Sequence, residues 1–149
     1  MSKTVLVIGA SRGIGKELVH QFAAKDLETF GFARNLQNGS DNKVHSIHLD
    51  LLSPTIKSDF EKAISGIDQI DYLIHNAGFV AVKPFLELTR EDIHNCYQVN
   101  VLSVMEITQI CIPKMKSGSH IVMISSIGGF QGSSKFPGLA AYSTSKAAL

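Results

Sequence analysis

Short apolar runs alternate along this sequence with longer segments in which apolar residues recur at helical spacing. The first run, residues 5–8, reads Val-Leu-Val-Ile, a composition typical of a strand buried on both faces of a parallel sheet. A weaker run, Thr-Phe-Gly-Phe-Ala, follows after the first helical segment. We predict five strands, over residues 5–8, 29–33, 44–49, 71–74 and 121–124.

Amphipathic stripes predict helices between the strands. The first stripe carries Ile14, Leu18 and Phe22. The second helix opens with Ser53–Pro54, which we interpret as an N-cap followed by proline at the first helical position. The apolar stripe of this second helix consists of Ile56, Phe60 and Ile64.

The third helix follows the segment Thr-Arg-Glu-Asp at residues 89–92, which resembles a capping box with Asp in place of the usual Glu. One face of this helix carries Ile93, Tyr97 and Val101. The helical pattern then resumes to about Met115, just before the last predicted strand.

A final helix is predicted to begin near Ala141, so that strands and helices alternate throughout the chain. This alternation indicates an α/β fold with a doubly wound parallel sheet, covered by helices on both faces. We find no internal repeat, low-complexity tract or second domain boundary. Residues 1–149 are therefore predicted to form one domain.

The composition favours a soluble globular protein, because 44% of the residues are hydrophobic and 18% are charged. The 14 basic and 13 acidic residues leave a net charge of +1. No block of like charges occurs, which argues against nucleic-acid and anionic-membrane partners. No apolar run approaches the length that spans a bilayer.

The two cysteines, Cys96 and Cys111, form no Cys-x-x-Cys pair and have no set of potential metal ligands beside them. We interpret them as reduced, buried thiols of an intracellular protein without a metal site. The first predicted strand begins almost at Met1, which leaves no room for a signal peptide. The expected compartment is the cytoplasm.

The segment Gly9-Ala-Ser-Arg-Gly13-Ile-Gly15 connects the first strand to the first helix. Glycines at such a turn let the backbone approach a ligand, and the N-terminus of the helix offers unpaired N–H groups to a pyrophosphate. We therefore predict a dinucleotide site here, with Ser11 in its polar lining. A tight turn that binds nothing is the simplest alternative.

Two other motifs overlap this turn and are disfavoured. A P-loop needs a glycine that four residues separate from its Gly-Lys pair and Ser or Thr after the pair, but these positions hold Ala10 and Glu17. The segment also matches the Gly-x-Ser-x-Gly nucleophile elbow of hydrolases. That elbow normally lies deep in the sheet, whereas here it follows the first strand, and no downstream histidine lies in a convincing context.

The end of the second predicted strand indicates which dinucleotide would bind. Sites for NAD place an acidic residue about 20 residues beyond the glycines, on the ribose 2′-hydroxyl. No acidic residue lies between Glu28 and Asp41; instead Arg34 stands at the strand end and Arg12 within the glycine turn. Two guanidinium groups suit the 2′-phosphate of NADP, which a carboxylate would repel. We predict NADP(H), with NAD(H) as the second choice.

Tyr142 and Lys146 form a Tyr-x-x-x-Lys pair on one face of the last predicted helix. Together with the glycine turn, this pair resembles the classical short-chain dehydrogenase/reductase family. Asp50, after the third strand, matches the acid that contacts adenine in that family. The segment His-Asn-Ala-Gly at residues 75–78 is similar to the family's Asn-Asn-Ala-Gly motif, with His in the first place.

The resemblance covers the whole chain and implies a Rossmann-like fold with strand order 3-2-1-4-5. The catalytic residues would be Asn100 in the third helix, Ser126 after the fifth strand, and the Tyr142–Lys146 pair. The implied cofactor-binding residues are Gly9, Ser11, Arg12, Gly13, Ile14, Gly15, Arg34, Asp50, Leu51, Asn76, Ala77, Gly78, Tyr142 and Lys146.

The resemblance also implies hydride transfer between NADP(H) and a carbonyl or alcohol substrate. A tyrosine phenol holds its proton too firmly for reversible transfer near neutral pH, and a neighbouring ammonium favours the phenolate. Tyr142 would exchange the proton, while Lys146 would assist it and bind the nicotinamide ribose. Ser126 would hydrogen-bond the substrate carbonyl. Asn100 would hold a water that links Lys146 to solvent or, alternatively, would satisfy a helix irregularity.

The stretch between Ser126 and Tyr142 is longer than is usual in the family and rich in glycine. We interpret it as an expanded loop near the substrate. It leaves Ser125, Ser133 and Ser134 as alternatives to Ser126. Neighbouring residues of a strand point to opposite faces, so only one of Ser125 and Ser126 can face the site.

The sequence stops one turn beyond Lys146, whereas family members continue with more of this helix and further strands. We therefore expect a chain truncated within the catalytic helix, with residues 121–124 as an unpaired apolar edge. The expected partners are a small carbonyl or alcohol substrate and, in a full-length form, further copies of the chain. A dinucleotide-binding module without turnover is the alternative function.

Overall fold

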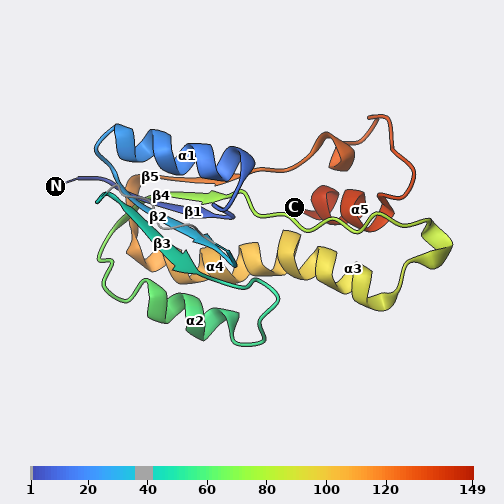
Figure 1. The fold of residues 1–149 in the computed structure, drawn as a ribbon, viewed down its shortest axis with the longest axis horizontal. Coiled ribbons are helices and arrows are strands. Elements are labelled where there is room, and N and C mark those ends of the chain that lie inside the picture. The colour runs from blue at the N-terminus through green and yellow to red at the C-terminus, as the bar shows by residue number, and fades with distance from the viewer. Residues whose placement is uncertain (1, 36–41) are drawn as a thin grey trace.

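A single parallel sheet forms the centre of the structure, a computed structural model that describes residues 2–35 and 42–149. Its strands are β1 (Thr4–Ile8), β2 (Glu28–Ala33), β3 (Val44–His48), β4 (Ile70–His75) and β5 (Met115–Met123). They pair in the order β3-β2-β1-β4-β5, and every pairing is parallel (Figure 1). The predicted Rossmann-like fold and strand order are thus confirmed.

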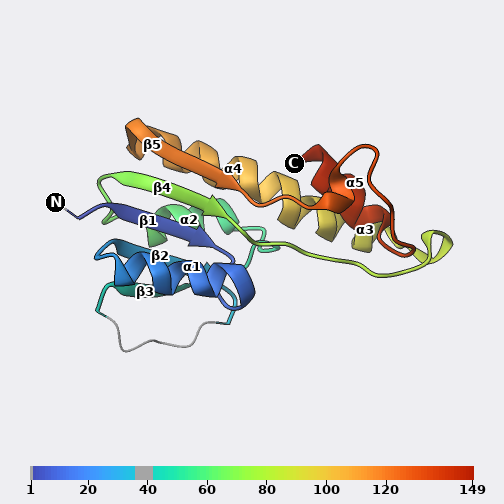
Figure 2. The same ribbon diagram turned by 90° about the horizontal axis from the view of Figure 1, so that it is seen from above.

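Helices cover both faces of this sheet. They are α1 (Gly13–Ala24), α2 (Ile56–Ala63), α3 (Arg90–Tyr97), α4 (Ser103–Cys111) and α5 (Ala140–Ala148). Short 3₁₀ turns are η1 (Phe85–Glu87), η3 (Ile112–Lys114) and η4 (Ile127–Gly129), and α3 continues into α4 through a π-helical segment, η2 (Gln98–Leu102). Figure 1 shows α1 on one face and α2 and α4 on the other. In Figure 2, α3 and α5 lie beyond the carboxyl ends of the strands, where they pack on each other.

The first strand shows how both faces are filled. Its side chains alternate between two apolar layers, and Val5 to Ile8 are all at most 2% exposed. Leu6 and Ile8 pack with the residues of α2 and α4, whereas Val5 and Val7 pack with those of α1. Burial on both faces holds the carboxyl end of β1, and therefore the glycine turn, in place.

The buried face of α1 differs from the predicted stripe. Ile14 is 60% exposed, so the prediction was wrong for this residue. Leu18 and Phe22 are partly buried against the sheet, as predicted. The buried positions lie one residue later and are Gly15, Val19 and Ala23. The first turn of the helix faces a cavity rather than the sheet, and Ile14 lines that cavity.

The second helix begins later than predicted. Its N-cap is Thr55 rather than Ser53, and Pro54 lies in the preceding turn. The hydroxyl of Ser53 accepts a hydrogen bond from the Thr55 N–H at 3.2 Å, while the Thr55 hydroxyl donates to Asp59 at 2.8 Å. The Ser-Pro pair therefore starts a turn that precedes the helix instead of the helix itself.

The third helix begins as predicted, with a complete capping box between Thr89 and Asp92. The fifth strand was predicted from residue 121, whereas β5 begins at Met115 and was therefore predicted too short. Between Ile70 and Tyr72 the pairing of β4 shifts from Met115 to His120. The extra residues form a polar bulge in which Gly118 has a φ of +90°, and polar residues of this kind resemble a loop in sequence.

The structure also bears on several expectations about composition. Cys96 and Cys111 are free and buried, as predicted.

β5 lies at the edge of the sheet, with Val122 and Met123 39% and 44% exposed, so the apolar edge is confirmed for the described strands. Over residues 2–35 and 42–149, no three His, Cys, Asp or Glu side chains lie close enough to share a metal ion. Within the same residues, no helix combines the length and apolar composition that a membrane crossing requires.

Candidate active site

A cavity of about 860 Å³ runs along the carboxyl ends of the strands. Residues that directly follow β1, β2, β3, β4 and β5 all line it, and α5 closes one end. Ligands of open α/β sheets bind at this edge, where the strand order reverses around β1. The predicted site residues that the cavity brings together are Gly9, Ser11, Arg12, Gly13, Ile14, Arg34, Asp50, Leu51, Asn76, Ala77, Gly78, Tyr142 and Lys146.

The glycine turn approaches its neighbours too closely for a side chain at Gly9. This residue has a φ of +93°, and a Cβ atom on it would lie 2.5 Å from the Ala77 nitrogen. The N–H groups of Gly9 and Ala10 donate to the Phe32 carbonyl at 2.8 and 3.1 Å. The turn is therefore fixed between the ends of β2 and β4.

Gly15 does not line the cavity but supports the turn from behind. A Cβ atom on Gly15 would lie 2.1 Å from the Gly9 carbonyl oxygen and 2.5 Å from Nδ2 of Asn76. That Nδ2 donates to the same Gly9 oxygen at 2.7 Å. Asn76 and Gly15 thus hold the turn together, one by a hydrogen bond and the other by leaving space for it.

The N-terminus of α1 faces this cavity with its backbone donors uncapped. Arg12 occupies the N-cap position without a side-chain cap, and the first turn holds no acidic residue. Uncapped N–H groups and the positive end of the helix dipole suit a phosphate. The cradle formed by Gly9, Gly13 and α1 therefore fits a pyrophosphate.

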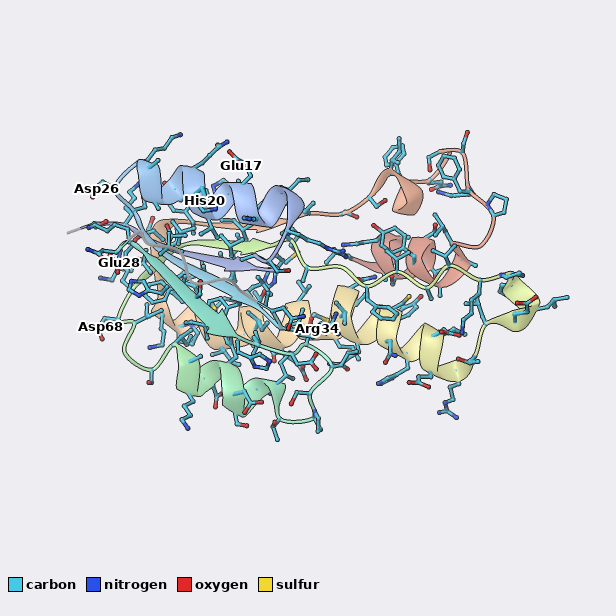
Figure 3. The ribbon with its side chains drawn as sticks, viewed as in Figure 1. Glu17, His20, Asp26, Glu28, Arg34 and Asp68 are labelled. Carbon is cyan, nitrogen blue, oxygen red and sulfur yellow. The ribbon has the colours of Figure 1, made fainter. Side chains whose placement is uncertain are left out.

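One end of the cavity carries positive charge. Arg12 and Arg34 are exposed, and neither forms an ion pair with any residue in the described part of the chain. In Figure 3, Arg34 lies at one end of the sheet, whereas Asp26, Glu28 and Asp68 lie at the other. The carboxylate that does line the cavity, Asp50, accepts a hydrogen bond from the Leu52 N–H at 3.0 Å.

Lys146 lies at the other end of the cavity, and it is 4% exposed. Its ammonium donates to the Ile124 carbonyl at 3.0 Å and has no carboxylate partner among the described residues. Burial lowers the pKa of this ammonium. Tyr142, one turn earlier on α5, is half-buried and lines the same cavity. A buried cation without a counter-ion is suited to stabilise negative charge that forms beside it.

Asn100 is fully buried in the π-helical segment η2 and does not line the cavity. Its Oδ1 accepts from the Phe79 N–H at 2.8 Å, and its Nδ2 donates to the Phe79 carbonyl at 3.0 Å and to Ser145 Oγ at 2.8 Å. The side chain therefore joins the irregular helix to the segment after β4 and to α5. A Cβ atom on Gly78 would lie 3.7 Å from both Asn100 Oδ1 and Lys146 Nζ, so the glycine leaves space beside both groups.

The two adjacent serines after β5 differ in position. Ser125 lines the cavity, and its hydroxyl donates to the Lys146 carbonyl at 3.0 Å. Ser126 does not line the cavity, and its hydroxyl accepts from the Gly128 N–H at 3.1 Å. Ser133 lies away from the cavity and donates to carbonyls of its own loop.

The sequence motifs missed the apolar part of the cavity lining. These residues are Ile8, Phe32, Ala33, Leu49, Leu52, Phe79, Val80, Val99 and Ile124, together with the polar Asn35. Most lie within three residues of a strand end. Strand ends that converge on one edge would have indicated them without any motif.

A family model described as short chain dehydrogenase matches residues 3–149. The chain belongs to the short-chain dehydrogenase family. Members of this family are oxidoreductases that bind NAD(P)(H) and act on small-molecule substrates. The predicted family resemblance is therefore confirmed.

Individual short-chain dehydrogenases are similar over the whole of this chain. An L-2,3-butanediol dehydrogenase of Corynebacterium glutamicum is 34% identical, covering 100% of this chain and 62% of the relative. A 3-oxoacyl-[acyl-carrier-protein] reductase of Aquifex aeolicus (strain VF5) is 32% identical, covering 99% and 63%. The crystal structure of a short-chain dehydrogenase from Streptomyces avermitilis superposes with a TM-score of 0.86 at 28% identity, covering 99% of this chain and 57% of that one. The chain thus spans about three fifths of the length of these relatives.

Proposed function

We propose that this chain binds NADP(H) as a single domain in the cytoplasm and transfers a hydride between it and a carbonyl or alcohol substrate. One observation carries the proposal: a single cavity joins the glycine turn to Tyr142 and Lys146. A phosphate cradle and a proton-transfer pair at opposite ends of one cavity suit a dinucleotide that spans both.

The preference for NADP(H) over NAD(H) rests on the charged end of the cavity. Arg12 and Arg34 have no ion-pair partner among the described residues and are free to bind a 2′-phosphate. The carboxylate of Asp50 follows β3 rather than β2 and is held by the Leu52 N–H. We therefore assign it to the adenine, as the family resemblance implies, rather than to the ribose 2′-position, and Leu51 lines the cavity beside it.

The bound nicotinamide would supply the hydride, and the residues of α5 would handle the proton. Tyr142 donates its phenolic proton to the carbonyl oxygen during reduction and takes a proton back during oxidation. Lys146 favours the phenolate, because its buried ammonium has no carboxylate partner in the described part of the chain. The remaining N–H groups of Lys146 are available to the ribose hydroxyls, since Ile124 accepts only one of them.

Among the serines, the hydrogen bonds favour Ser126 as the residue that binds the substrate oxygen. This role requires a hydroxyl proton that is free to be donated. Ser125 already donates its proton to the Lys146 carbonyl, and Ser133 donates its proton within its loop. Ser126 accepts a hydrogen bond from Gly128 and keeps its proton.

Asn100 acts in this proposal as a positioning residue. Its side chain holds Phe79 and Ser145, and therefore holds α5 at a fixed distance from the segment after β4. The space beside Gly78, Asn100 Oδ1 and Lys146 Nζ is suited to a water that relays protons to Lys146.

A dinucleotide-binding module without turnover is the second candidate function. It is favoured by the position of Ser126, which does not line the cavity that joins the glycine turn to Tyr142 and Lys146. In this case the glycine turn and the two arginines would hold the dinucleotide, but no substrate would be reduced.

The test combines NADPH binding, measured by the change in NADPH fluorescence, with carbonyl-dependent NADPH oxidation over a broad carbonyl panel. The oxidoreductase proposal predicts binding and oxidation, with Ser126→Ala roughly 100-fold slower and Ser125→Ala within a few-fold of the parent. Binding without oxidation of any carbonyl would support the binding module instead. Absence of NADPH binding would overturn both candidates.

A further inference from the structure

Two loops meet beside the N-terminal end of α5. One connects β4 to α3 and includes residues 79–89, and the other connects β5 to α5 and includes residues 127–139. The Lys83 N–H donates to the Gly138 carbonyl at 3.1 Å, and a Cβ atom on Gly138 would lie 3.5 Å from Cγ1 of Val82. Gly138 precedes Tyr142 by one helical turn, and both loops run beside α5 in Figures 1 and 2. The joined loops therefore lie at the Tyr142 end of the cavity.

The two lysines of these loops already have hydrogen-bond or ion-pair partners. The ammonium of Lys135 donates to the carbonyls of Gly128 and Phe130 at 2.9 and 2.6 Å and to Ser133 Oγ at 2.8 Å. The ammonium of Lys83 pairs with Asp92 at 2.6 Å, at the start of α3. These interactions fix both loops and engage both ammonium groups.

The apolar side chains of the same loops are left exposed. Val82 and Phe130 are both 70% exposed, and Phe136 is 66% exposed. Surface loops normally show the opposite arrangement, with polar groups toward water, and clustered exposed apolar side chains mark a binding surface. We call Val80, Val82, Phe130 and Phe136 the apolar rim.

The rim continues the lining of the cavity. Val80 lines the cavity itself and lies two residues before Val82. Phe79, Val99 and Ile124 line the cavity as well. The arginines of the cavity follow β1 and β2, whereas the rim follows β4 and β5. The two arginines and the apolar rim are therefore placed at different ends of the site.

We infer that the substrate carries its carbonyl on an uncharged, apolar body, such as an alkyl chain or a hydrocarbon ring, which the apolar rim covers. This inference rests on the proposed function, because it takes Tyr142 as the point where the carbonyl binds. The two lysines of these loops, Lys83 and Lys135, are already engaged, so neither offers a free ammonium to a carboxylate. Contact between apolar side chains and a hydrocarbon lowers the free energy, because both are removed from water. A hydroxylated substrate would lose hydrogen bonds to water on the same surface.

The experiment measures the affinity of 2-alkanones, from 2-butanone to 2-octanone, for the chain saturated with NADP⁺. NADP⁺ cannot reduce a ketone, so binding is separated from turnover. Dissociation constants come from titrations followed by ¹⁵N–¹H NMR. Each methylene that the rim covers should tighten binding by about threefold to fourfold. Dihydroxyacetone, a small polar ketone, serves as the comparison and should bind more weakly than 2-octanone by at least tenfold.

Two variants locate the effect. Phe136→Ser should reduce the increase in affinity that each methylene of the ketone brings, because it removes an apolar side chain of the rim. Ile112→Ser is the matched control: Ile112 is 55% exposed but lies in η3, next to the start of β5, and its loss should leave the gain unchanged.

Three results would overturn the inference. The affinity for the 2-alkanones could be independent of the length of their alkyl chain. Alternatively, Phe136→Ser could keep the full increase in affinity per methylene. The chain could also form a dimer in sedimentation velocity that Phe136→Ser dissociates while showing no preference for longer ketones, which would make the rim an interface between copies. Failure to bind NADP⁺ at all would instead refute the proposed function, and the inference with it.

Discussion

At the scale of single residues, the glycine turn holds two kinds of glycine. Gly9 needs its positive φ and its close approach to Ala77, whereas Gly15 needs only the space that a side chain would fill. Both requirements belong to the backbone, so they are visible in sequence as glycines at fixed spacing. The partners that impose them, Asn76 and Ala77, come from β4 and could not be identified by spacing alone.

Gly15→Ala should therefore weaken the turn without changing its charge. The added methyl group would overlap the Gly9 oxygen and Asn76 Nδ2, and we expect a loss of about 1 to 3 kcal/mol in unfolding free energy. NADPH binding should weaken by about tenfold or more, since each 1.4 kcal/mol is a factor of ten. Urea unfolding and NADPH fluorescence measure the two effects. Gly66→Ala is the control, because no atom lies within 4 Å of its added Cβ; an equal loss in both variants would contradict the assigned role of Gly15.

Arg34→Asp tests the preference between the two dinucleotides. A carboxylate at the end of β2 would repel a 2′-phosphate and accept a hydrogen bond from a 2′-hydroxyl. We expect the dissociation constant of NADPH to rise roughly 10- to 100-fold, the value of one charge-assisted hydrogen bond, while NADH binds as well as before or better. Arg90→Asp, on the exposed start of α3, should change neither constant. An unchanged NADPH affinity in Arg34→Asp would refute the role of Arg34.

Other residue roles depend on contacts that sequence does not contain. Ser125 and Ser126 are the same residue type in adjacent positions, and only their hydrogen bonds separate them. Those bonds depend on the carbonyl of Lys146 and on the turn at Gly128, which the fold brings close. The sequence therefore could not decide between the two serines, because their hydrogen-bond partners are brought close only by the fold.

At the scale of elements, the strands buried on both faces were the most predictable. Their apolar runs correspond to strands in the structure, whereas boundaries differ where polar residues belong to regular structure, as in the bulge at the start of β5. The helical pattern was predicted to resume after the third helix, and an irregularity at Asn100 was one of two alternatives, but its π-helical form was not predicted. That turn follows from tertiary contacts: Asn100 bonds to Phe79 and Ser145, which come from other elements.

His75 connects two elements beneath the site. It ends β4, and its Nε2 lies 2.9 Å from the Thr108 hydroxyl on α4. The side chain is 3% exposed, and within the described structure its Nδ1 has no hydrogen-bond partner. Burial lowers the pKa of His75 from its ordinary value of 6.5 to about 4.

This pKa predicts how stability depends on pH. As the pH falls from about 6.5 to about 4, the unfolded chain binds a proton that the folded chain does not, so the free energy of unfolding falls. The loss is complete below the folded pKa and amounts to about 3 kcal/mol. Urea unfolding at pH 7 and pH 5 measures about 2 kcal/mol of this loss, because pH 5 still lies above the pKa of His75 in the folded chain. His75→Asn should reduce the change in unfolding free energy between pH 7 and pH 5. His94→Asn, a substitution at an exposed position of α3, should not reduce it. The same slope in the parent and in His75→Asn would contradict the argument.

At the scale of the whole molecule, the alternation of strands and helices predicted a parallel sheet covered on both faces, whereas the strand order was implied by the family resemblance. Parallel strands need crossover helices, and the run buried on both faces places β1 in the interior of the sheet. The same order places every strand end at one edge, which is why motifs from residues 9 to 146 converge on one cavity. The junction between the loop after β4 and the loop before α5 was not predictable, because it depends on one hydrogen bond between residues 83 and 138.

The central claim is that one dinucleotide spans this cavity from the glycine turn to α5. A crystal structure of the chain with NADP⁺ tests it most directly. The account predicts the 2′-phosphate within hydrogen-bond distance of Arg12 and Arg34, and the nicotinamide ribose at Lys146 Nζ. A dinucleotide bound elsewhere, or one whose 2′-phosphate contacts neither arginine, would contradict it.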